Sequence, residues 1–201
     1  MNEKVRLAVF VSGGGSNLQS IMDNCSAGNI DAEVVLVLSN KKKAYGLVRA
    51  SEAGIDTVVY KRKKFSNGNE ADEFLLNLLD EYRIDIIVLA GYLKMIAPPV
   101  IDKYRGRIVN IHPGTLPKYG GKGMFGSRVH KAVIEAGEKE TAVTIHYVDE
   151  IYDHGQIMAE RKIPVLPDDT PDELAARVLK VEHELYPEVI KFLVEKYRKE
   201  S

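Results

Sequence analysis

The sequence has little cysteine, almost no net charge and no long apolar run. Its single cysteine, Cys25, excludes an internal disulfide and fits a reducing compartment. The 28 Lys and Arg residues nearly balance 29 Asp and Glu residues, for a net charge of −1, so charge predicts neither a nucleic acid nor an anionic membrane as partner. Neither a membrane-spanning run nor a signal-like N-terminal segment is present. We therefore expect a soluble, cytoplasmic protein.

The pattern of apolar residues predicts one α/β domain. Of the 201 residues, 45% are apolar, which is enough to bury one sizeable core. Short runs rich in β-branched residues alternate with segments of helical periodicity, which favours right-handed crossovers and a mostly parallel, Rossmann-like sheet with helices on both faces. The parallel strands are expected at residues 5–11, 33–39, 57–60, 85–90 and 107–112, and the helices between them at residues 18–25, 46–53, 74–82 and 98–104.

The last part of the chain departs from this parallel pattern. After a helix expected from about residue 127, residues 141–148 alternate between apolar and polar side chains, and residues 156–165 follow closely enough for an antiparallel return. Thr170 then begins a Thr-Pro-Asp-Glu capping box. The helix that it opens is expected to kink or end at Pro187, before a last helix.

Asn110 and His112 are conspicuous polar residues at the end of an apolar strand. Side chains alternate along a strand, so these two point to the same side, about 6.6 Å apart along the chain. Pro113 and Gly114 end the strand, which places His112 at the carboxyl edge where open α/β sheets bind ligands. The pair either bonds to the following loop or donates to one reacting oxygen, with His112 able to move a proton near neutral pH.

A Gly-rich loop, residues 12–17, separates the first strand from the first helix. This arrangement presents backbone N–H groups and a helix N-terminus to an anion. The loop lacks the Lys-Ser/Thr ending of a nucleoside-triphosphate P-loop and the G-x-G-x-x-G spacing of a dinucleotide site. It is interpreted either as a site for one phosphate, to which Ser16 and Asn17 add side-chain donors, or as a turn without a ligand.

Two acidic residues also call for an explanation. Glu182 shares an apolar helical stripe with Leu174 and Val178, and buried carboxylates are rare without partners. Asp153 follows a strand expected to neighbour that of His112, where a carboxylate would raise the pKa of the imidazole; the alternative is a turn residue that bonds its own backbone. The five histidines form no H-x-x-x-H or H-E-x-x-H pair, so no metal site is expected.

Taken together, these motifs resemble the glycinamide ribonucleotide formyltransferase family. The likeness runs in order through nearly the whole chain, at residues 12–19, 88–93, 110–113, 153–155 and 182–183. It implies the formyltransferase fold in one domain, residues 1–201, with a phosphate-binding Rossmann-like half (about 1–105) and a catalytic, folate-contacting half (about 106–201). It also implies transfer of a formyl group from 10-formyltetrahydrofolate, a co-substrate, to the amine of glycinamide ribonucleotide in de novo purine biosynthesis.

The resemblance further implies roles for individual residues. Asn110 and protonated His112 would stabilise the oxygen of a tetrahedral intermediate, while Asp153 keeps His112 charged and relays the proton of the amine. The ribonucleotide would bind Gly15, Ser16, Asn17 and Glu182. The folate would bind in a slot formed by Leu89, Leu93, Lys94, Met95, Ile96, Asn110 and Val148. The implied partners are these two small molecules, with no metal, nucleic acid or membrane, in a monomer or homodimer.

The chain departs from the family pattern at several positions. Gly114-Thr115 follows His112-Pro113 where Ser-Leu is usual, Lys94 stands where Arg is common, and the loop 120–128 is longer and richer in glycine. The sequence leaves open the conformation of this loop and which of three basic residues, if any, contacts folate: Arg62, Lys63 or Lys64.

Four alternatives share parts of this pattern. A formyltetrahydrofolate hydrolase usually has an extra N-terminal domain and a methionyl-tRNA formyltransferase a C-terminal one, and neither is expected here because the first strand begins at Val5 and the chain ends soon after its last helix. A sugar-nucleotide formyltransferase is a weaker alternative, because the loop at Gly15, Ser16 and Asn17 suits a terminal phosphate. A non-catalytic nucleotide-binding module would not need Asn110, His112 and Asp153 together.

Overall fold

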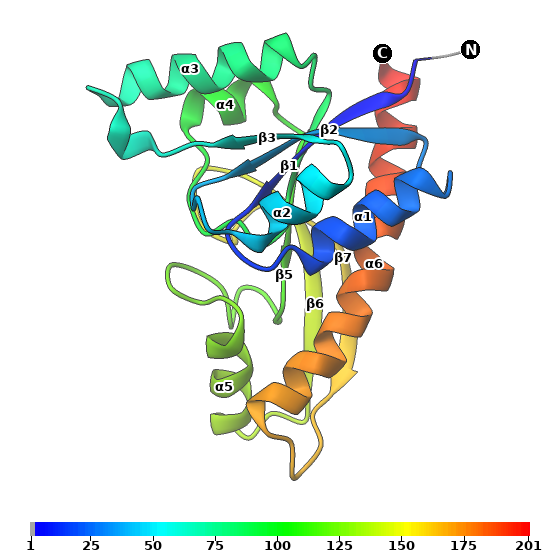
Figure 1. Cartoon of the computed structure of the whole chain (residues 1–201). Coiled ribbons are helices and arrows are strands. Elements are labelled where there is room, and N and C mark those ends of the chain that lie inside the picture. Colours follow the sequence, from blue (N-terminus) through cyan, green and yellow to red (C-terminus); the bar gives the residue numbers. More distant parts are fainter. Residues whose placement is uncertain (1–2) are drawn as a thin grey trace.

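The centre of the molecule is a seven-stranded sheet with the strand order β3-β2-β1-β4-β5-β6-β7 (Figure 1). A computed structural model of the chain describes residues 3–201. Strands β1 to β5 are parallel, whereas β6 runs antiparallel to β5 and β7 antiparallel to β6. The expected fold class is confirmed. The strands are β1 (Val5–Val11), β2 (Ala32–Ser39), β3 (Asp56–Val59), β4 (Ile86–Leu89), β5 (Ile108–His112), β6 (Glu140–Tyr147) and β7 (Ile157–Pro164).

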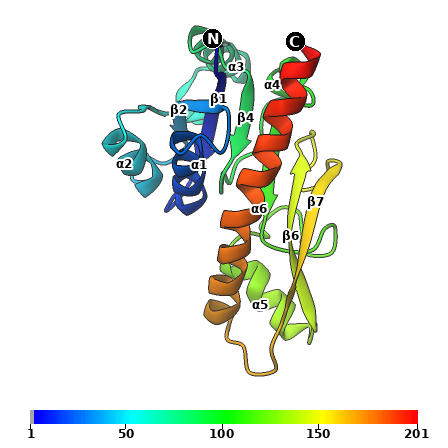
Figure 2. The same cartoon turned by 90° about the vertical axis from the view of Figure 1, so that its right-hand side faces the viewer.

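Helices cover both faces of the sheet (Figures 1 and 2). One apolar core contains side chains from α1, α2, α5 and α6, and a second contains side chains from α3 and α4. In residues 3–201, no helix is long and apolar enough to cross a membrane. The helices are α1 (Ser16–Ser26), α2 (Tyr45–Glu52), α3 (Gly68–Glu81), α4 (Pro98–Lys103), α5 (Ser127–Glu135) and α6 (Pro171–Glu200), with a 3₁₀ turn, η1 (Arg62–Lys64).

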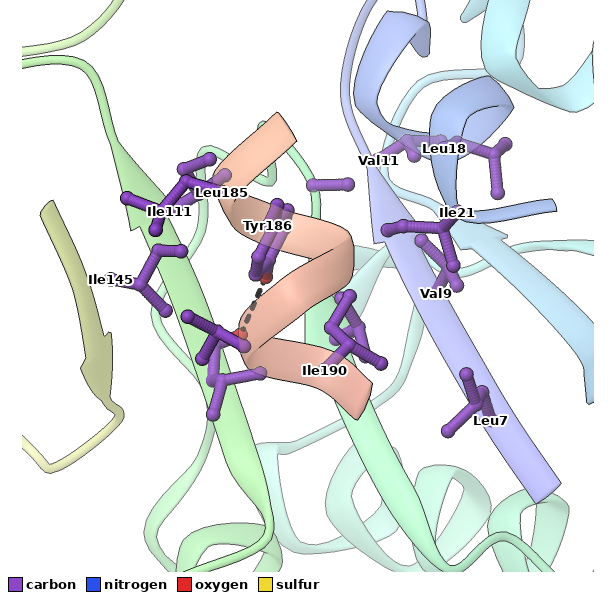
Figure 3. Close-up of a cluster of buried hydrophobic side chains, with 14 of the residues drawn as sticks. Leu7, Val9, Val11, Leu18, Ile21, Ile111, Ile145, Leu185, Tyr186 and Ile190 are labelled. Carbon is purple, nitrogen blue, oxygen red and sulfur yellow. Dashed lines mark hydrogen bonds between the residues drawn. The ribbon is translucent and has the colours of Figure 1, made fainter. Parts of the chain in front are cut away.

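The apolar runs of the sequence form strands that are buried on both faces. In β1, Leu7 and Val9 face the core beneath α6, while Ala8 and Phe10 face the core beneath α3 and α4. Figure 3 shows the first of these cores, where β1, α1 and α6 meet. A parallel strand covered on both sides needs apolar residues at successive positions, which explains the continuous run in the sequence.

Helix α6 continues through Pro187, which corrects the expectation of a break there. It is one helix of 30 residues, and it begins with the capping box expected at Thr170. Proline removes the hydrogen bond to the carbonyl four residues earlier, which belongs to His183. This carbonyl accepts instead from Ser20 Oγ of α1 at 2.9 Å, so the lost bond has a replacement that sequence periodicity does not reveal.

A buried tyrosine joins α6 to the backbone of the central strands β4 and β5. Tyr186 is fully buried, and its hydroxyl lies 2.9 Å from the Leu89 carbonyl oxygen and 3.2 Å from that of Val109. A buried hydroxyl without a partner costs free energy, so these contacts favour one placement of the helix. They position α6, which carries Glu182, against β4 and β5.

Candidate active site

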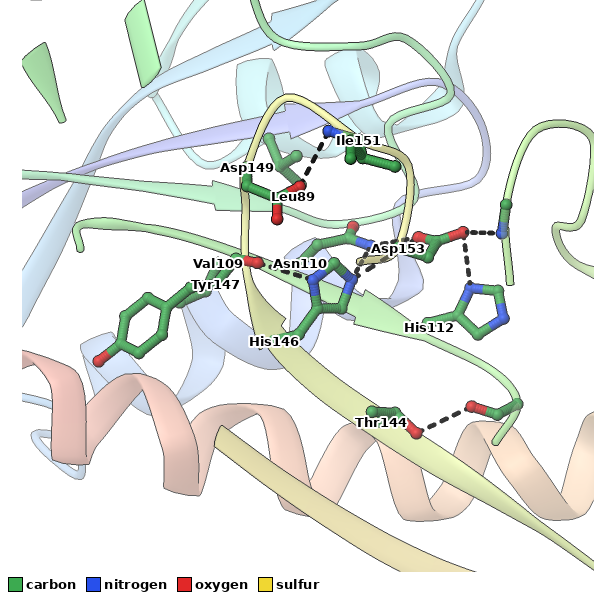
Figure 4. Close-up of polar contacts among 12 residues, drawn as sticks. Leu89, Val109, Asn110, His112, Thr144, His146, Tyr147, Asp149, Ile151 and Asp153 are labelled. Atoms are coloured by element: carbon green, nitrogen blue, oxygen red, sulfur yellow. Dashed lines mark hydrogen bonds and ion pairs between the residues drawn. The ribbon is translucent and has the colours of Figure 1, made fainter. Parts of the chain in front are cut away.

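Asp153 brings its carboxylate to the side chains of Asn110 and His112 at the end of β5 (Figure 4). Its Oδ2 atom lies 3.6 Å from His112 Nδ1 and accepts the Gly121 amide at 2.9 Å, while Oδ1 accepts from Asn110 Nδ2 at 3.4 Å. Asp153 has a left-handed φ of 53°, which Asp tolerates better than most residues. The residue that bonds its own turn is Asp149, through the Ile151 amide. The three side chains expected to act together therefore converge.

His112 is buried, and both of its ring nitrogens face partners. Nε2 lies 2.8 Å from the carbonyl oxygen of Tyr119, so this nitrogen carries a proton. Nδ1 faces Asp153 and takes up the second proton when the ring becomes charged. Only 3% of His112 is exposed, yet the residue lines a cleft, so a ligand in that cleft can reach its ring.

Burial lowers the pKa of His112 below its usual value of 6.5, although Asp153 and the Tyr119 carbonyl oppose this effect. The sequence predicts the opposite direction, because it shows the carboxylate but not the loop that covers the ring. Desolvation disfavours the charged imidazolium, and here it outweighs the attraction of a carboxylate 3.6 Å away. At neutral pH the unliganded ring is therefore mainly uncharged.

His146 belongs to the same polar cluster, although the sequence does not single it out as a site residue. Its Nδ1 donates to the carbonyl oxygen of Tyr147 at 2.8 Å, which leaves Nε2 to accept from Asn110 Nδ2 at 3.1 Å. Nε2 also lies 3.6 Å from Asp153 Oδ1. His146 is placed here by the β5–β6 register, which pairs it with Asn110.

The carboxylate of Asp153 is stabilised in its charged form. Burial acts to raise its pKa, but contacts with His146, His112 and the Gly121 amide together lower the pKa below 3.8. A charged Asp153 between two imidazoles stabilises the protonated form of either ring. The site thus combines an ionised acid, a neutral imidazole and an amide at one point.

A cleft of about 510 Å³ runs from this cluster to the phosphate loop. Asn110, His112 and Asp153 line one part of it, and Asn17 and Glu182 line another. The glycine-rich segment 121–126 also lines the cleft, so the loop whose conformation the sequence leaves open borders the catalytic cluster.

The predicted ribonucleotide residues occupy different positions around the phosphate loop. Gly15 has a left-handed φ of 73°, and a Cβ there would lie 2.6 Å from Gly46 Cα, so both the conformation and the close approach of α2 require glycine. Asn17 reaches the cleft, whereas Ser16 lines a separate hollow beside Arg49 and His183.

Glu182 is the buried acid that the apolar stripe of α6 makes conspicuous. It is 8% exposed, and one oxygen accepts from Asn17 Nδ2 at 2.8 Å. Burial raises its pKa, and the bond from Asn17 only partly opposes this effect. A carboxylate that faces a cleft with unused acceptor sites is suited to bind hydroxyl groups.

The predicted folate residues gather at a narrow slot of about 50 Å³ next to Asp153. Leu93 is the exception, because it lines the central cleft instead. A larger cavity of about 640 Å³ adjoins the slot and shares Tyr92, Lys94, Met95 and Ile96 with it. The predicted residues that line the slot are Leu89, Lys94, Met95, Ile96, Asn110 and Val148.

The rim of this adjoining cavity is basic. Lys61, Arg62 and Lys63 line it, and Arg62 forms an ion pair with Asp72 at 2.8 Å. Lys64 is not among its lining residues. Of the three basic residues considered from the sequence, Lys63 therefore faces the cavity without an ion-pair partner among the described residues.

Comparisons with known proteins agree with one another. The family model described as "Formyl transferase" matches residues 5–190. A phosphoribosylglycinamide formyltransferase of Haemophilus influenzae is 43% identical over 190 residues, which cover 94% of this chain and 87% of that protein. A chloroplastic one of Arabidopsis thaliana is 46% identical over 92% of this chain, which spans only 64% of that longer protein.

Solved structures with this fold extend the comparison. A phosphoribosylglycinamide formyltransferase from Brucella melitensis superposes with a TM-score of 0.87 at 41% identity, covering 96% of each chain. A glycinamide ribonucleotide transformylase from Symbiobacterium toebii gives a TM-score of 0.89 at 35% identity, over 98% of this chain and 90% of the other.

Proposed function

We propose that this chain, which belongs to the formyl transferase family and within it to the phosphoribosylglycinamide formyltransferases, formylates the amine of glycinamide ribonucleotide. The formyl donor is 10-formyltetrahydrofolate, and the reaction is a step of de novo purine biosynthesis. The observation that carries the proposal is the convergence of Asn110, His112 and Asp153 beside a cleft that leads to a phosphate loop.

The ribonucleotide lies along the cleft between the phosphate loop and Asp153. Its phosphate accepts hydrogen bonds from the backbone N–H groups of Gly15, Ser16 and Asn17 at the N-terminus of α1, where the helix dipole favours an anion. Its ribose hydroxyls bond to Glu182, which explains why a carboxylate is retained on a buried stripe. This arrangement directs the amine toward Asp153.

The folate lies in the slot on the other side of the catalytic cluster. Apolar side chains from Leu89, Ile96 and Val148 contact its pterin ring, and the rest of the molecule extends over Met95 toward the basic rim at Lys94. In this assignment residues 1–105 hold the phosphate, and residues 106–201 supply the catalytic groups.

The chemistry is direct attack of the amine on the formyl carbon. A carbon–nitrogen bond forms, and the carbonyl electrons move to the formyl oxygen, which becomes an oxyanion. Donors aligned with such an oxygen typically contribute ~2.7–4 kcal/mol each. Asn110 Nδ2 is one donor: its 3.4 Å hydrogen bond to Asp153 is replaced by a hydrogen bond to the oxyanion. His112 becomes the other through its protonated Nδ1, which lies 3.6 Å from Asp153 and can turn its hydrogen bond to the oxyanion. The developing negative charge raises the pKa that burial lowers.

Collapse of the intermediate breaks the bond to the folate nitrogen. The attacking amine must lose a proton and the departing nitrogen must gain one, so the products are the formylated ribonucleotide and tetrahydrofolate. Asp153 lies between His112 and His146 and carries this proton, directly or through water. Holding both substrates in one cleft supplies much of the remaining rate.

The test is a formyl-transfer assay with 10-formyltetrahydrofolate and three acceptors: glycinamide ribonucleotide, glycinamide and water. We expect rapid transfer to the ribonucleotide, little to glycinamide because it lacks the phosphate and ribose, and slow release of formate. Formate release at the same rate with and without ribonucleotide would identify a hydrolase. Absence of transfer to the ribonucleotide would contradict the proposal.

A further inference from the structure

Helix α2 holds the phosphate loop through two carbonyl groups of the loop. Gly13 O accepts the Gly46 amide at 3.0 Å, and Gly14 O accepts from Arg49 Nε at 2.9 Å. A trans peptide unit is planar, with its C=O and N–H on opposite sides, so these bonds aim the N–H groups of Gly14 and Gly15 away from α2. In the part of the chain that the structure describes, neither N–H group has an acceptor.

The side chain of Arg49 is itself held in place. Its Nη1 lies 3.2 Å from Gln19 Oε1 of α1, and its guanidinium carbon lies 5.0 Å from the centre of the Tyr45 ring. None of the ion pairs found among residues 3–201 involves Arg49. A guanidinium held by two further contacts thus bonds directly to the backbone of the loop.

We propose that Arg49 is a positioning residue for the phosphate of the ribonucleotide, an inference that rests on the proposed function. Its Nε–H fixes the peptide between Gly14 and Gly15, so that the Gly15 N–H is aimed before the phosphate arrives. A donor that is already aligned loses less entropy on binding than one that must be ordered. Glycine has no Cβ to limit its rotation, so a loop of three successive glycines needs such a restraint from outside.

The geometry separates this role from simple charge attraction. Arginine presents a planar fork that donates to Gly14 O and Gln19 Oε1 at the same time, whereas lysine offers a single ammonium on a flexible stem. Arg49→Lys therefore keeps the charge but not the restraint. Arg49→Met removes both and keeps an apolar stem of similar length.

The experiment measures the dissociation constants of ribose 5-phosphate and glycinamide ribonucleotide by calorimetry, and kcat with both KM values by the formyl-transfer assay. We expect Arg49→Met to weaken both phosphorylated ligands by about tenfold or more, the size of one lost charge-assisted hydrogen bond. Arg49→Lys should recover only part of this loss. The KM for folate and kcat at saturating ribonucleotide should change less than twofold.

Val48→Ala is the matched control, since Val48 lies on the same helix and is 44% exposed. Wild-type affinity for ribose 5-phosphate in Arg49→Met, wild-type affinity in Arg49→Lys, or an equal loss in Val48→Ala would each overturn the inference. Unphosphorylated ribose serves as the negative ligand, and equal weakening of its binding would point to a general structural defect and also overturn it.

These measurements distinguish the inference from the proposed function. Binding of ribose 5-phosphate requires no formyl chemistry. If Arg49→Met loses this binding in a protein that never transfers a formyl group, the proposed function fails and the positioning role stands. If the wild type transfers formyl groups and Arg49→Met binds normally, the positioning role fails alone. If the wild type transfers formyl groups to the ribonucleotide but does not bind ribose 5-phosphate, the positioning role likewise fails alone.

Discussion

Asn17 Nδ2 donates a hydrogen bond of 2.8 Å to Glu182 Oε2, which joins the first turn of α1 to the middle of α6. Both residues line the central cleft, so the bond spans the place where we put the ribonucleotide. Asn17 Oδ1 is also buried and has no hydrogen-bond partner among residues 3–201. A bound ribose can use this acceptor and the free lone pairs of Glu182.

Glu182→Gln should weaken ribonucleotide binding and stabilise the free protein. Burial raises the pKa of Glu182 in the folded protein above its pKa in the unfolded chain. The folded protein therefore loses stability as the pH rises from the unfolded-state pKa through the folded-state pKa. The amide is uncharged, so this loss disappears at pH 7. Because Gln has one acceptor oxygen rather than two, we expect the ribonucleotide dissociation constant to rise roughly tenfold.

Calorimetry and denaturant unfolding at pH 7 check the two parts of this prediction. Glu184→Gln on the same helix is the control, since Glu184 is exposed and pairs with Arg161. An unchanged ribonucleotide dissociation constant in Glu182→Gln would show that the acid does not contact the ribose.

Gly15→Ala should destabilise the phosphate loop. The substitution places a methyl group 2.6 Å from Gly46 Cα and holds alanine at a φ of 73°. We expect the free energy of unfolding to fall by about 1–3 kcal/mol. Gly14→Ala is the control for stability, because a Cβ at Gly14 meets nothing within 4 Å. Equal stability of the two variants in denaturant titrations would contradict the close packing of α2 against the loop.

Stability should fall as the pH drops below about 6.5, partly through His130. Burial lowers the pKa of His130, and the positive charge that His112 takes up at low pH lowers it further, so the unfolded chain binds a proton more readily than the folded one. Such a group destabilises the fold progressively from its unfolded pKa down to its folded pKa. One proton accounts for a slope of at most about 1.4 kcal/mol per pH unit.

Denaturant unfolding of His130→Gln and wild type from pH 8 to pH 5 measures this contribution. Above pH 7 the difference in the free energy of unfolding between them should be constant. Below pH 6.5 the wild type should lose stability faster. Parallel curves across the whole range would exclude His130 as a source of the pH dependence.

The elements that positioned the site were predictable because each depends on local pattern. The apolar spacing of Leu18, Ile21 and Cys25 predicts the buried face of α1, and all three side chains are buried there. Cys25 is a buried thiol on this face, and burial raises its pKa to about 11. Alternation along β5 likewise predicts that Asn110 and His112 share a side.

The features that were missed depend on long-range contacts. His146 joins the catalytic cluster only because the β5–β6 register sets it opposite Asn110. The pKa of His112 depends on how deeply its ring is buried, and that burial comes from tertiary packing that the local sequence does not show. The continuity of α6 at Pro187 depends on Ser20, which is 163 residues away from His183 in the chain.

The central claim is that Asp153 serves the chemical step rather than the binding of substrates. The most direct measurement is the single-turnover rate of formyl transfer by Asp153→Asn, with the ribonucleotide dissociation constant measured on the same protein. The amide can still accept the Gly121 N–H but cannot carry a proton for His112. We predict a rate at least about 10²-fold lower, the lower end for a lost proton-transfer group, with ribonucleotide affinity within twofold of wild type. A rate within threefold of wild type would contradict the account.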